Sequence, residues 1–227
     1  MQIIYEDNHL IVVNKAPGEI VQGDKTGDQP LSEAVALYLK QRYNKPGNAF
    51  VGVVHRLDRP VGGLVIFAKT SKALERMNQL FREGKVEKHY WAIVANAPNP
   101  EQGRLIHWLK KNEKQNKSYA SNSPKDGAKR AELTYRTLAK SKNYTLLDVQ
   151  LLTGRHHQIR CQLATIGSPI KGDLKYGAPR SNPDASISLL SYQINFEHPV
   201  SHLPISLTAP LPPDPLWQAF APTTPQN

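Results

Sequence analysis

Hydrophobic and polar residues alternate along several stretches of the chain with a period of two, which is typical of β-strands. In residues 64–68, for example, Leu64 and Ile66 share one face while Val65 and Phe67 share the other. The sequence therefore predicts strands at 64–68, 86–95, 131–138, 144–152 and 189–196. It also predicts two short strands within 2–14, around a polar turn at 6–9.

Apolar residues recur at helical spacing in three other stretches. The expected helices span about 31–43, 71–82 and 157–166, and Gly167 is a suitable C-terminal cap for the last of them. The final dozen residues are rich in proline. We expect residues 216–227 to form a flexible tail behind a single domain of residues 1–215.

A first candidate site lies directly before the strand at 64–68. Asp58 stands between Arg56 and Arg59 and is followed by Pro60 and a pair of glycines at 62 and 63. The two arginines are expected to flank the carboxylate and to favour its charged form. The glycines are expected to leave backbone room for the approach of another molecule. The alternative is an ordinary surface ion pair, which contributes little.

A second candidate site follows the strand at 144–152. Thr153 and Gly154 break that strand, and the helix expected at 157–166 comes next. Arg160 lies four residues after His156, so the two are expected to project from one side of the helix, away from its apolar side. Arg160 can therefore point into a cleft.

Several separated motifs occur in an order that resembles the RluA family of pseudouridine synthases. They are His-Arg-Leu-Asp-Arg at 55–59, Thr-Gly-Arg-His-His-Gln-Ile-Arg at 153–160 and Pro-Ile-Lys-Gly-Asp-Leu-Lys-Tyr-Gly at 169–177, together with blocks at 5–15 and 88–92. The resemblance covers roughly residues 3 to 208. It departs at Val61 and Gly62, where family members often have Thr and Ser, which loosens any hydroxyl-dependent role of this loop.

The resemblance implies an α+β fold with a central mixed, mainly antiparallel sheet, flanking helices and an active-site cleft. It also implies an enzyme that isomerises specific uridines in structured RNA, either ribosomal or transfer RNA. In this reaction the base is detached, rotated and reattached through carbon five. Some family members carry a separate N-terminal RNA-binding module, and none is expected here.

By the same resemblance, four residues receive roles. Asp58 matches the catalytic carboxylate and Arg160 matches the arginine that pairs with it. Tyr90 matches a tyrosine that stacks on the flipped uracil, and it is a candidate base. Arg56 matches an arginine that fills the stack vacated by the flipped base. For Tyr90, the strand pattern alone favours a core aromatic residue with a satisfied hydroxyl.

A net charge of +10 favours a polyanionic partner, since cations that neutralise phosphates drive such binding. Residues 104–130 are crowded with lysines, with Trp108 and Tyr119 between them, as in an RNA-facing hairpin. The expected RNA contacts are Arg56, Arg59, Arg155, His156, Lys110, Lys111 and Lys114. The alternatives are a highly soluble protein without an RNA role and, for residues 104–130, a solvated charged loop.

Other features bound the cellular context. The single cysteine, Cys161, excludes an internal disulfide, fits a reducing compartment and is expected to be buried. No apolar run is long enough to span a membrane, and the N-terminus lacks the pattern of a signal peptide. We expect a cytoplasmic monomer without an obligatory protein partner.

No cofactor is expected, because the implied isomerisation involves no net redox or phosphate chemistry. No metal is expected either, since His55, His156 and His157 lack metal-ligand spacing and an acidic partner.

Two other functions remain open. One is a catalytically inactive RNA-binding protein with the same fold. The other is a glycoside hydrolase, which generally needs two carboxylates that flank the scissile bond. Asp148 or Asp173 would have to be the second carboxylate beside Asp58, and no sequence pattern pairs either of them with it.

Overall fold

The computed structural model describes residues 1–24 and 26–221. The helices are α1 (Leu31–Arg42), α2 (Ser71–Arg82), α3 (Gln158–Thr165), the one-turn η1 (Leu174–Tyr176) and α4 (Pro215–Gln218). The strands are β1 (Gln2–Glu6), β2 (Leu10–Lys15), β3 (Gly52–Val53), β4 (Gly62–Ala68), β5 (Glu87–Val94), β6 (Gln102–Asn112), β7 (Lys117–Ser121), β8 (Lys129–Lys140), β9 (Thr145–Leu151), β10 (Leu189–Glu197) and β11 (Pro204–Thr208). All the predicted strands and the three predicted long helices are present.

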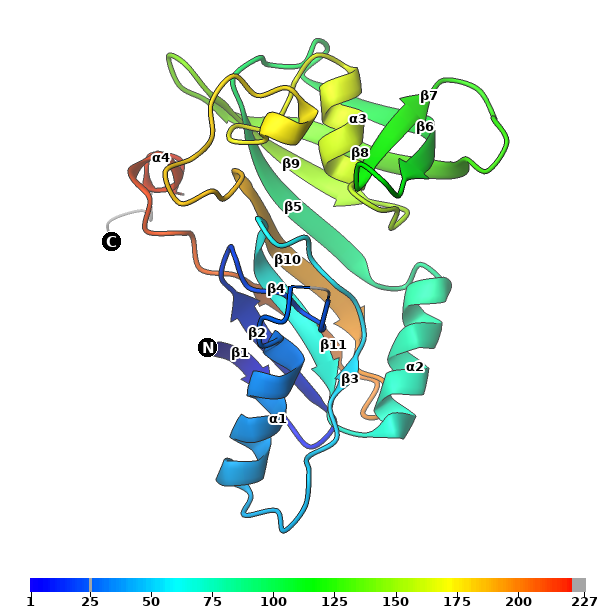
Figure 1. Ribbon diagram of the computed structural model, residues 1–227, viewed down its shortest axis with the longest axis vertical. Helices are drawn as coiled ribbons and strands as arrows, with labels where there is room; N and C mark the ends of the chain where they lie inside the picture. The colour runs from blue at the N-terminus through cyan, green and yellow to red at the C-terminus, as the bar shows by residue number, and fades with distance from the viewer. Residues whose placement is uncertain (25, 222–227) are drawn as a thin grey trace.

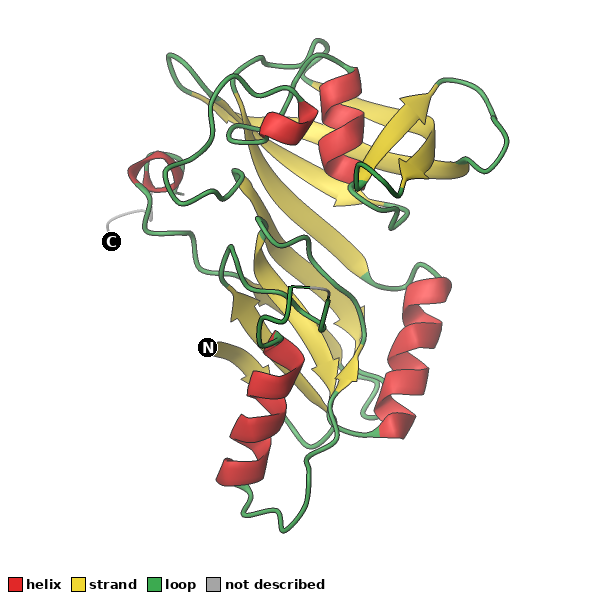
Figure 2. Cartoon of the chain, viewed as in Figure 1, coloured by secondary structure: helices red, strands yellow, loops and turns green. Residues whose placement is uncertain are grey.

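Within the described residues, the strands form one long mixed sheet with the order β1-β2-β4-β10-β5-β9-β8-β6-β7. β11 pairs with β10, and β3 pairs with β4. β4 and β10 run parallel, whereas the other paired strands are antiparallel. The molecule is elongated, with β1 to β4, α1 and α2 in one half and β6 to β9 and α3 in the other (Figures 1 and 2). This is the predicted α+β fold.

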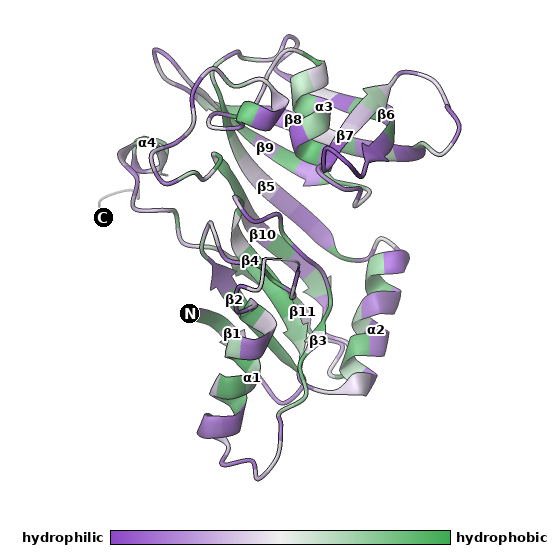
Figure 3. Cartoon of the chain, viewed as in Figure 1, coloured by the Kyte–Doolittle hydropathy of each residue, from purple (hydrophilic) through white to green (hydrophobic). Residues whose placement is uncertain are grey.

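The alternation along β4 and β5 sorts their side chains into separate cores. Val65 and Phe67 pack with α1 in one cluster, and Tyr90 and Ala92 pack with α3 in another. The opposite residues of both strands, such as Ile66, join a third cluster that also contains α2. Figure 3 shows the result, with β4 apolar along its length and α2 alternating between apolar and polar residues.

The glycine pair at 62 and 63 has a different role from the predicted one. Both residues lie inside β4, where they pair with Leu190 and Ser191 of β10. A Cβ on Gly63 would come within 2.3 Å of the Ser191 carbonyl oxygen, and Gly63 has a φ of +111°. Glycine is therefore required by the close approach of β10, and the room that it leaves is filled by protein.

The end of the chain also differs from the prediction of a flexible tail from residue 216. α4 and the residue pair after it place Trp217 and Phe220 in the third core cluster, at 6% and 8% exposure. The Asp214 carboxylate caps α4 by accepting from the Leu216 and Trp217 amides. Residues 222–227 lie outside the described residues. None of the helices that the structure describes has both the length and the apolar character needed to cross a membrane.

Candidate active site

A cleft of about 980 Å³ lies where the two halves of the molecule meet. Its walls come from residues 20–24 and 26, the loop at 55–61, β5 and residues 154–160. We call residues 55–61 the aspartate loop, and residues 153–176 the arginine wall. The cleft lining includes Asp58, Tyr90, Arg160, Arg56, Arg155 and His156, so the structure brings these predicted site residues together.

The aspartate loop is anchored on both sides of the cleft. Leu57 packs against the clusters of α1 and α3, which places the next residue, Asp58, between the two halves. The Val61 amide donates to the Asp58 carbonyl oxygen at 3.0 Å and closes a turn. The Asp58 side chain is 29% exposed, so its carboxylate is open to the cleft.

A buried lysine holds the same loop from behind. Lys15 is 1% exposed, and its Nζ donates to the carbonyl oxygens of Ala16, Arg59 and Val61 at 3.0, 3.1 and 2.7 Å. Three acceptors match the three protons of an ammonium group. Burial lowers the pKa of Lys15 to about 8. Lys15 therefore fixes the backbone directly after Asp58.

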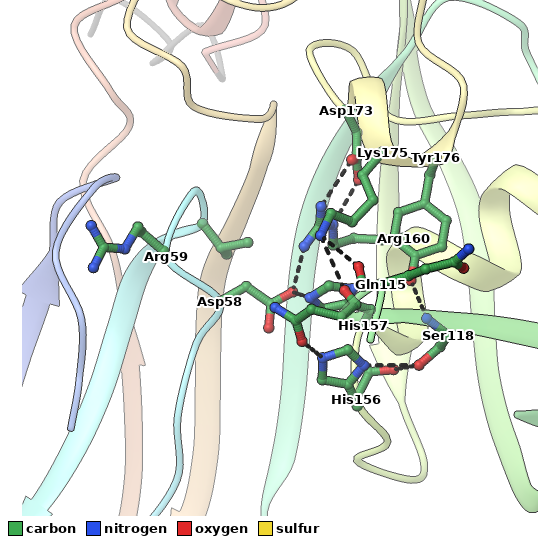
Figure 4. Close-up of polar contacts among 12 residues, drawn as sticks. Asp58, Arg59, Gln115, Ser118, His156, His157, Arg160, Asp173, Lys175 and Tyr176 are labelled. Atoms are coloured by element: carbon green, nitrogen blue, oxygen red, sulfur yellow. Dashed lines mark hydrogen bonds and ion pairs between the residues drawn. The ribbon is translucent and has the colours of Figure 1, made fainter. Parts of the chain in front are cut away.

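Arg160 extends from α3 to Asp58. Its Nε and Nη2 donate to the two carboxylate oxygens of Asp173 at 2.7 and 2.9 Å, and its Nη1 donates to Asp58 Oδ2 at 3.0 Å. The guanidinium also lies 5.2 Å from the centre of the Tyr176 ring. Burial alone would lower the pKa of Arg160, but the two carboxylates outweigh burial and raise it. The predicted pairing of Arg160 with Asp58 is present (Figure 4).

The neighbouring arginines do not flank Asp58 as the sequence suggested. Arg59 points away from Asp58 in Figure 4, and its Nη2 binds Asp28 at 2.6 Å and lies 3.8 Å from Asp24. Arg56 is exposed and lines the cleft. Adjacent side chains in an extended segment point in different directions, which separates Arg59 from Asp58. The guanidinium that meets Asp58 comes from a residue 102 positions away.

His157 also lies beside the Asp58 carboxylate, and the sequence patterns gave it no role there. It caps α3 with a left-handed φ of +52°, and its Nε2 lies 3.5 Å from Asp58 Oδ2. Its Nδ1 lies 3.0 Å from the Tyr176 hydroxyl, which accepts from the Ser118 amide at 2.8 Å. Burial, followed by the charge of Arg160, lowers the pKa of His157 to about 2. If the hydroxyl donates to Nδ1, neutral His157 carries its proton on Nε2, facing Asp58.

His156 precedes α3, so the expectation that it shares a helix side with Arg160 is wrong. The left-handed His157 turns the chain there, and the two histidine rings stack with centroids 3.8 Å apart. His156 Nδ1 lies 2.9 Å from the Ser118 hydroxyl, and Nε2 lies 3.1 Å from Asn116 Oδ1. His156 thereby connects the β6–β7 hairpin to the arginine wall.

Tyr90 is both a core residue and part of the cleft lining. It is 7% exposed and packs in the α3 cluster, yet it lines the cleft beside Asp58. Burial, together with the charge of Asp58, raises the pKa of Tyr90 to about 12. Its hydroxyl therefore stays protonated near neutral pH, which favours stacking over proton abstraction.

The three predicted lysines of the hairpin separate in the structure. Lys111 lines the cleft and pairs with Glu113 at 2.6 Å. Lys110, the preceding residue of β6, instead donates to the Asp126 carbonyl oxygen at 3.0 Å. Lys114 is exposed in the turn outside the cleft. Neighbouring residues of a strand point to opposite faces, so the lysines form no single surface.

The carboxylates required for a glycoside hydrolase are engaged elsewhere. Asp173 is 1% exposed and is fully used by Arg160. Asp148 lies in a separate pocket, where it contacts His89 and Arg136. Neither carboxylate can act opposite Asp58. In the part of the chain that the structure describes, no group of three or more His, Cys, Asp or Glu side chains is arranged to hold a metal.

Sequence reasoning gave no site role to Lys15 or Tyr176, and it considered Asp173 only as a hydrolase carboxylate. Lys15 ends β2, whose first four residues are apolar and buried, and this pattern could have indicated a buried ammonium. Asp173 and Tyr176 lie within the block at 169–177 that carried the family resemblance. Cys161 is buried as predicted, and its thiol donates to the Ser118 carbonyl oxygen at 3.3 Å.

Comparisons with known proteins define the class to which this fold and cleft belong. Residues 9–165 match the family model described as RNA pseudouridylate synthase. The chain is 31% identical over 224 residues to ribosomal large subunit pseudouridine synthase D of Zymomonas mobilis, covering 94% of this chain and 70% of that protein. It is 33% identical over 215 residues to ribosomal large subunit pseudouridine synthase C of Vibrio cholerae, covering 92% and 65%.

A solved structure, Human RNA Pseudouridylate Synthase Domain Containing 4, shares the fold with a TM-score of 0.78. The match covers 93% of this chain and 89% of that one, at 23% sequence identity. The chain belongs to the RNA pseudouridylate synthase family. The resemblance to the RluA family, the fold class and the predicted enzyme class are confirmed.

Proposed function

We propose that this protein isomerises a uridine of large-subunit ribosomal RNA to pseudouridine in the cleft between its two halves, with Asp58 as the catalytic carboxylate. The observation that carries the proposal is the contact between Asp58 and Arg160. An accessible carboxylate is held there by a guanidinium that is itself fixed by a buried carboxylate.

In this proposal each side chain has a distinct part. Arg160 keeps Asp58 ionised and aimed at the sugar of the target nucleotide, because a charge-assisted hydrogen bond favours the charged form. Tyr90 stacks on the uracil with its hydroxyl protonated. Arg56, exposed at the cleft, takes the place of the flipped base, and extrusion costs a few kcal/mol of lost stacking. The protein groups supply positioning and charge, and no cofactor takes part.

Two observations support ribosomal RNA as the substrate. The similar proteins include two that are named as ribosomal large subunit pseudouridine synthases. The chain has a net charge of +10, and among the described residues the cleft lining contains seven arginines or lysines and two acidic residues, Asp24 and Asp58. We further propose that the enzyme acts as a monomer. We place the enzyme in the cytoplasm, with its proposed substrate.

The test is release of tritium from RNA labelled at carbon five of uridine, since the new glycosidic bond replaces the hydrogen there. Total RNA from cells without this enzyme is the substrate, and fractionation then identifies the RNA that reacts. We expect release by the wild type, and a loss of at least about a thousand-fold for Asp58→Asn. RNA affinity should stay within about two-fold, because Asp58 makes no favourable phosphate contact.

The matched control is Glu75→Gln, which removes an exposed carboxylate of α2 outside the cleft. This variant should release tritium at the wild-type rate. Tight RNA binding without release by the wild type, on every fraction, would favour the inactive RNA-binding alternative. A large loss of RNA affinity in Asp58→Asn would contradict the role given to Asp58.

A further inference from the structure

One end of the cleft contains a group of side chains to which the proposed chemistry gives no role. It is formed by His55, Phe81 and Lys88, all of which line the same cleft as Asp58. Lys88 lies two residues before Tyr90 in β5, so both side chains leave the same face of the sheet. Their Cα atoms are about 7 Å apart at the usual rise of a strand.

Lys88, unlike Lys15, Lys69 and Lys171, has no oxygen partner among the described residues, a property that it shares with the part-buried Lys117. Lys15 donates to three carbonyl oxygens, Lys69 binds Glu6 at 2.8 Å, and Lys171 donates to Asn182 at 2.5 Å. For Lys88, the contact among the described residues is the Phe81 ring, whose centroid lies 5.3 Å from Nζ. Burial lowers the pKa of Lys88, as expected for an ammonium that has lost water without gaining an anion.

His55 adds a second donor at the same place. Its Nε2 accepts a hydrogen bond from the Ile66 amide at 3.1 Å, so the proton of the neutral ring is on Nδ1. Burial, followed by the charge of Lys88, lowers the pKa of His55 to about 3, which keeps the ring neutral. The ring stacks on Phe81 with centroids 5.2 Å apart. No acceptor for the Nδ1 proton is found among the described residues.

We propose that Lys88 Nζ and the Nδ1–H of His55, above the Phe81 ring, form a binding site for one phosphodiester of the RNA next to the target uridine. This inference rests on the proposed function and specifies how the cleft holds its substrate. An ammonium beside a neutral N–H group, with no acceptor nearby, selects an anion. Lys88 and Tyr90 leave the same face of β5, which places this site beside the proposed position of the uracil.

The first experiment compares Lys88→Gln, Lys88→Arg and Lys85→Gln. Lys85 is the matched control, because it is exposed, pairs with Glu83 at 2.7 Å and does not line the cleft. Binding to a fluorescent RNA decamer with a single uridine is measured from low to high salt. For Lys88→Gln we expect weaker binding, and a plot of log affinity against log salt that is shallower by about 0.7. Lys88→Arg and Lys85→Gln should keep the wild-type slope.

The second experiment identifies the phosphate. Neutral methylphosphonate replaces the linkage on the 5′ or the 3′ side of the uridine, one at a time. One replacement should weaken binding by wild type and have little effect on Lys88→Gln, because the two changes remove the same contact. Turnover of the reactive RNA fraction by Lys88→Gln should show a raised KM with kcat within about two-fold.

Several results would overturn the proposal. Equal salt slopes for Lys88→Gln and Lys85→Gln would do so, as would additive effects of Lys88→Gln and each methylphosphonate. A fall in kcat at unchanged KM would mean that Lys88 serves the chemical step instead. Failure of the wild type to bind the decamer at low salt would also count against the site. The proposed function is judged separately, by tritium release and Asp58→Asn.

Discussion

The two walls that meet at Asp58 are built by different means. On the arginine wall, side chains hold one another: Arg160 binds Asp173 through two hydrogen bonds, and Tyr176 contacts both Arg160 and His157. On the aspartate loop, the anchors are backbone groups, with Lys15 binding three carbonyl oxygens. Asp173 is 1% exposed, whereas the side chain of Asp58 is 29% exposed.

Because of this difference, the buried contacts of the arginine wall stabilise the fold, whereas the aspartate loop leaves the Asp58 carboxylate accessible to substrate. A buried network can hold a cation in one orientation, but it leaves no room for substrate. A loop that is fixed through its backbone keeps its side chain free to meet a ligand. The arginine wall therefore provides a rigid charge, and the aspartate loop presents the group that reaches the nucleotide. The two walls should respond differently to substitution.

The largest effect on stability is expected for Asp173→Asn on the arginine wall. The change removes the buried anion opposite Arg160 and turns an amide group toward a guanidinium. Breaking a buried ion pair from one side costs about 3 to 5 kcal/mol of unfolding free energy. Urea unfolding measures the loss, and tritium release should fall in parallel because Arg160 is no longer held toward Asp58.

The comparison is with Asp58→Asn, for which we expect a change of less than about 1 kcal/mol, since an open carboxylate loses little on neutralisation. Glu75→Gln controls for the loss of one negative charge. If Asp58→Asn and Asp173→Asn proved equally destabilising, the distinction between the two walls would be wrong.

The sequence predicted this site only in part, and the reason lies in the range of the contacts. Local periodicity indicated the strands and long helices, because each depends on neighbours within a few residues. The motifs pointed to Asp58 and Arg160, but the flanking of Asp58 by Arg56 and Arg59 was wrong. Which guanidinium reaches a carboxylate depends on how distant segments are brought together.

The same reason explains two other errors. The glycines at 62 and 63 were assigned to ligand approach, but Gly63 makes room for β10, a strand more than 120 residues later in the chain, and Gly62 lies against Lys15 and Pro17. Residues 216–220 were assigned to a flexible tail, but Trp217 and Phe220 fill a gap in the core. Composition indicates local flexibility. It does not show that Trp217 and Phe220 pack against apolar residues from distant parts of the chain.

Lys15→Met should cause the next largest loss of unfolding free energy. Methionine keeps most of the side-chain length and leaves the carbonyl groups of Ala16, Arg59 and Val61 without their donor. We expect a loss of about 2 to 4 kcal/mol of unfolding free energy, by analogy with other buried groups that lose their partners. At a temperature where the variant is folded, kcat should still fall about ten-fold or more, because the backbone after Asp58 is released.

Differential scanning calorimetry and tritium release together test this prediction. A variant with reduced stability but wild-type kcat would show that Lys15 supports the fold and does not position Asp58. Wild-type stability would mean that the three hydrogen bonds only balance the cost of burying the ammonium.

Substitutions in the β6–β7 hairpin, which lies next to the arginine wall, should have a smaller effect, and this effect should be on RNA affinity. Lys111 lines the cleft, whereas the adjacent Lys110 binds the Asp126 carbonyl oxygen. Lys111→Gln should weaken RNA binding a few-fold and make its salt dependence shallower, and Lys110→Gln should do less. The pair differ by one position and remove the same charge. Equal effects would mean that the hairpin acts through its overall charge.

The smallest effect concerns an ion pair that belongs to neither wall. His89 lies on the face of β5 opposite Tyr90, with Nδ1 2.9 Å from Asp148 Oδ1 and Nε2 3.4 Å from Glu87 Oε1. Arg136 also contacts Asp148, at 3.1 Å. The hydrogen bond that His89 donates to the Asp148 carboxylate outweighs burial and raises the pKa of His89 above its ordinary value of 6.5.

A pKa that is raised in the folded state determines whether the unfolding free energy rises or falls with pH. Above pH 6.5 the folded protein holds the His89 proton more tightly than the unfolded chain does, so the unfolding free energy falls as the pH rises through the folded pKa. Below pH 6.5 the contribution of His89 is complete. The part-buried His55 and the buried His157 have lowered pKa values and act in the opposite sense, so the wild-type curve must be compared with that of His89→Gln.

Urea unfolding of both proteins between pH 5 and 9 gives this difference. The wild type should be the more stable at pH 6, and its advantage should shrink toward pH 9. The ratio of kcat values should stay constant over that range, because His89 does not face the cleft. A pH-dependent change in that ratio would mean that the opposite face of β5 is coupled to the site, and the two walls could not be treated as its only supports.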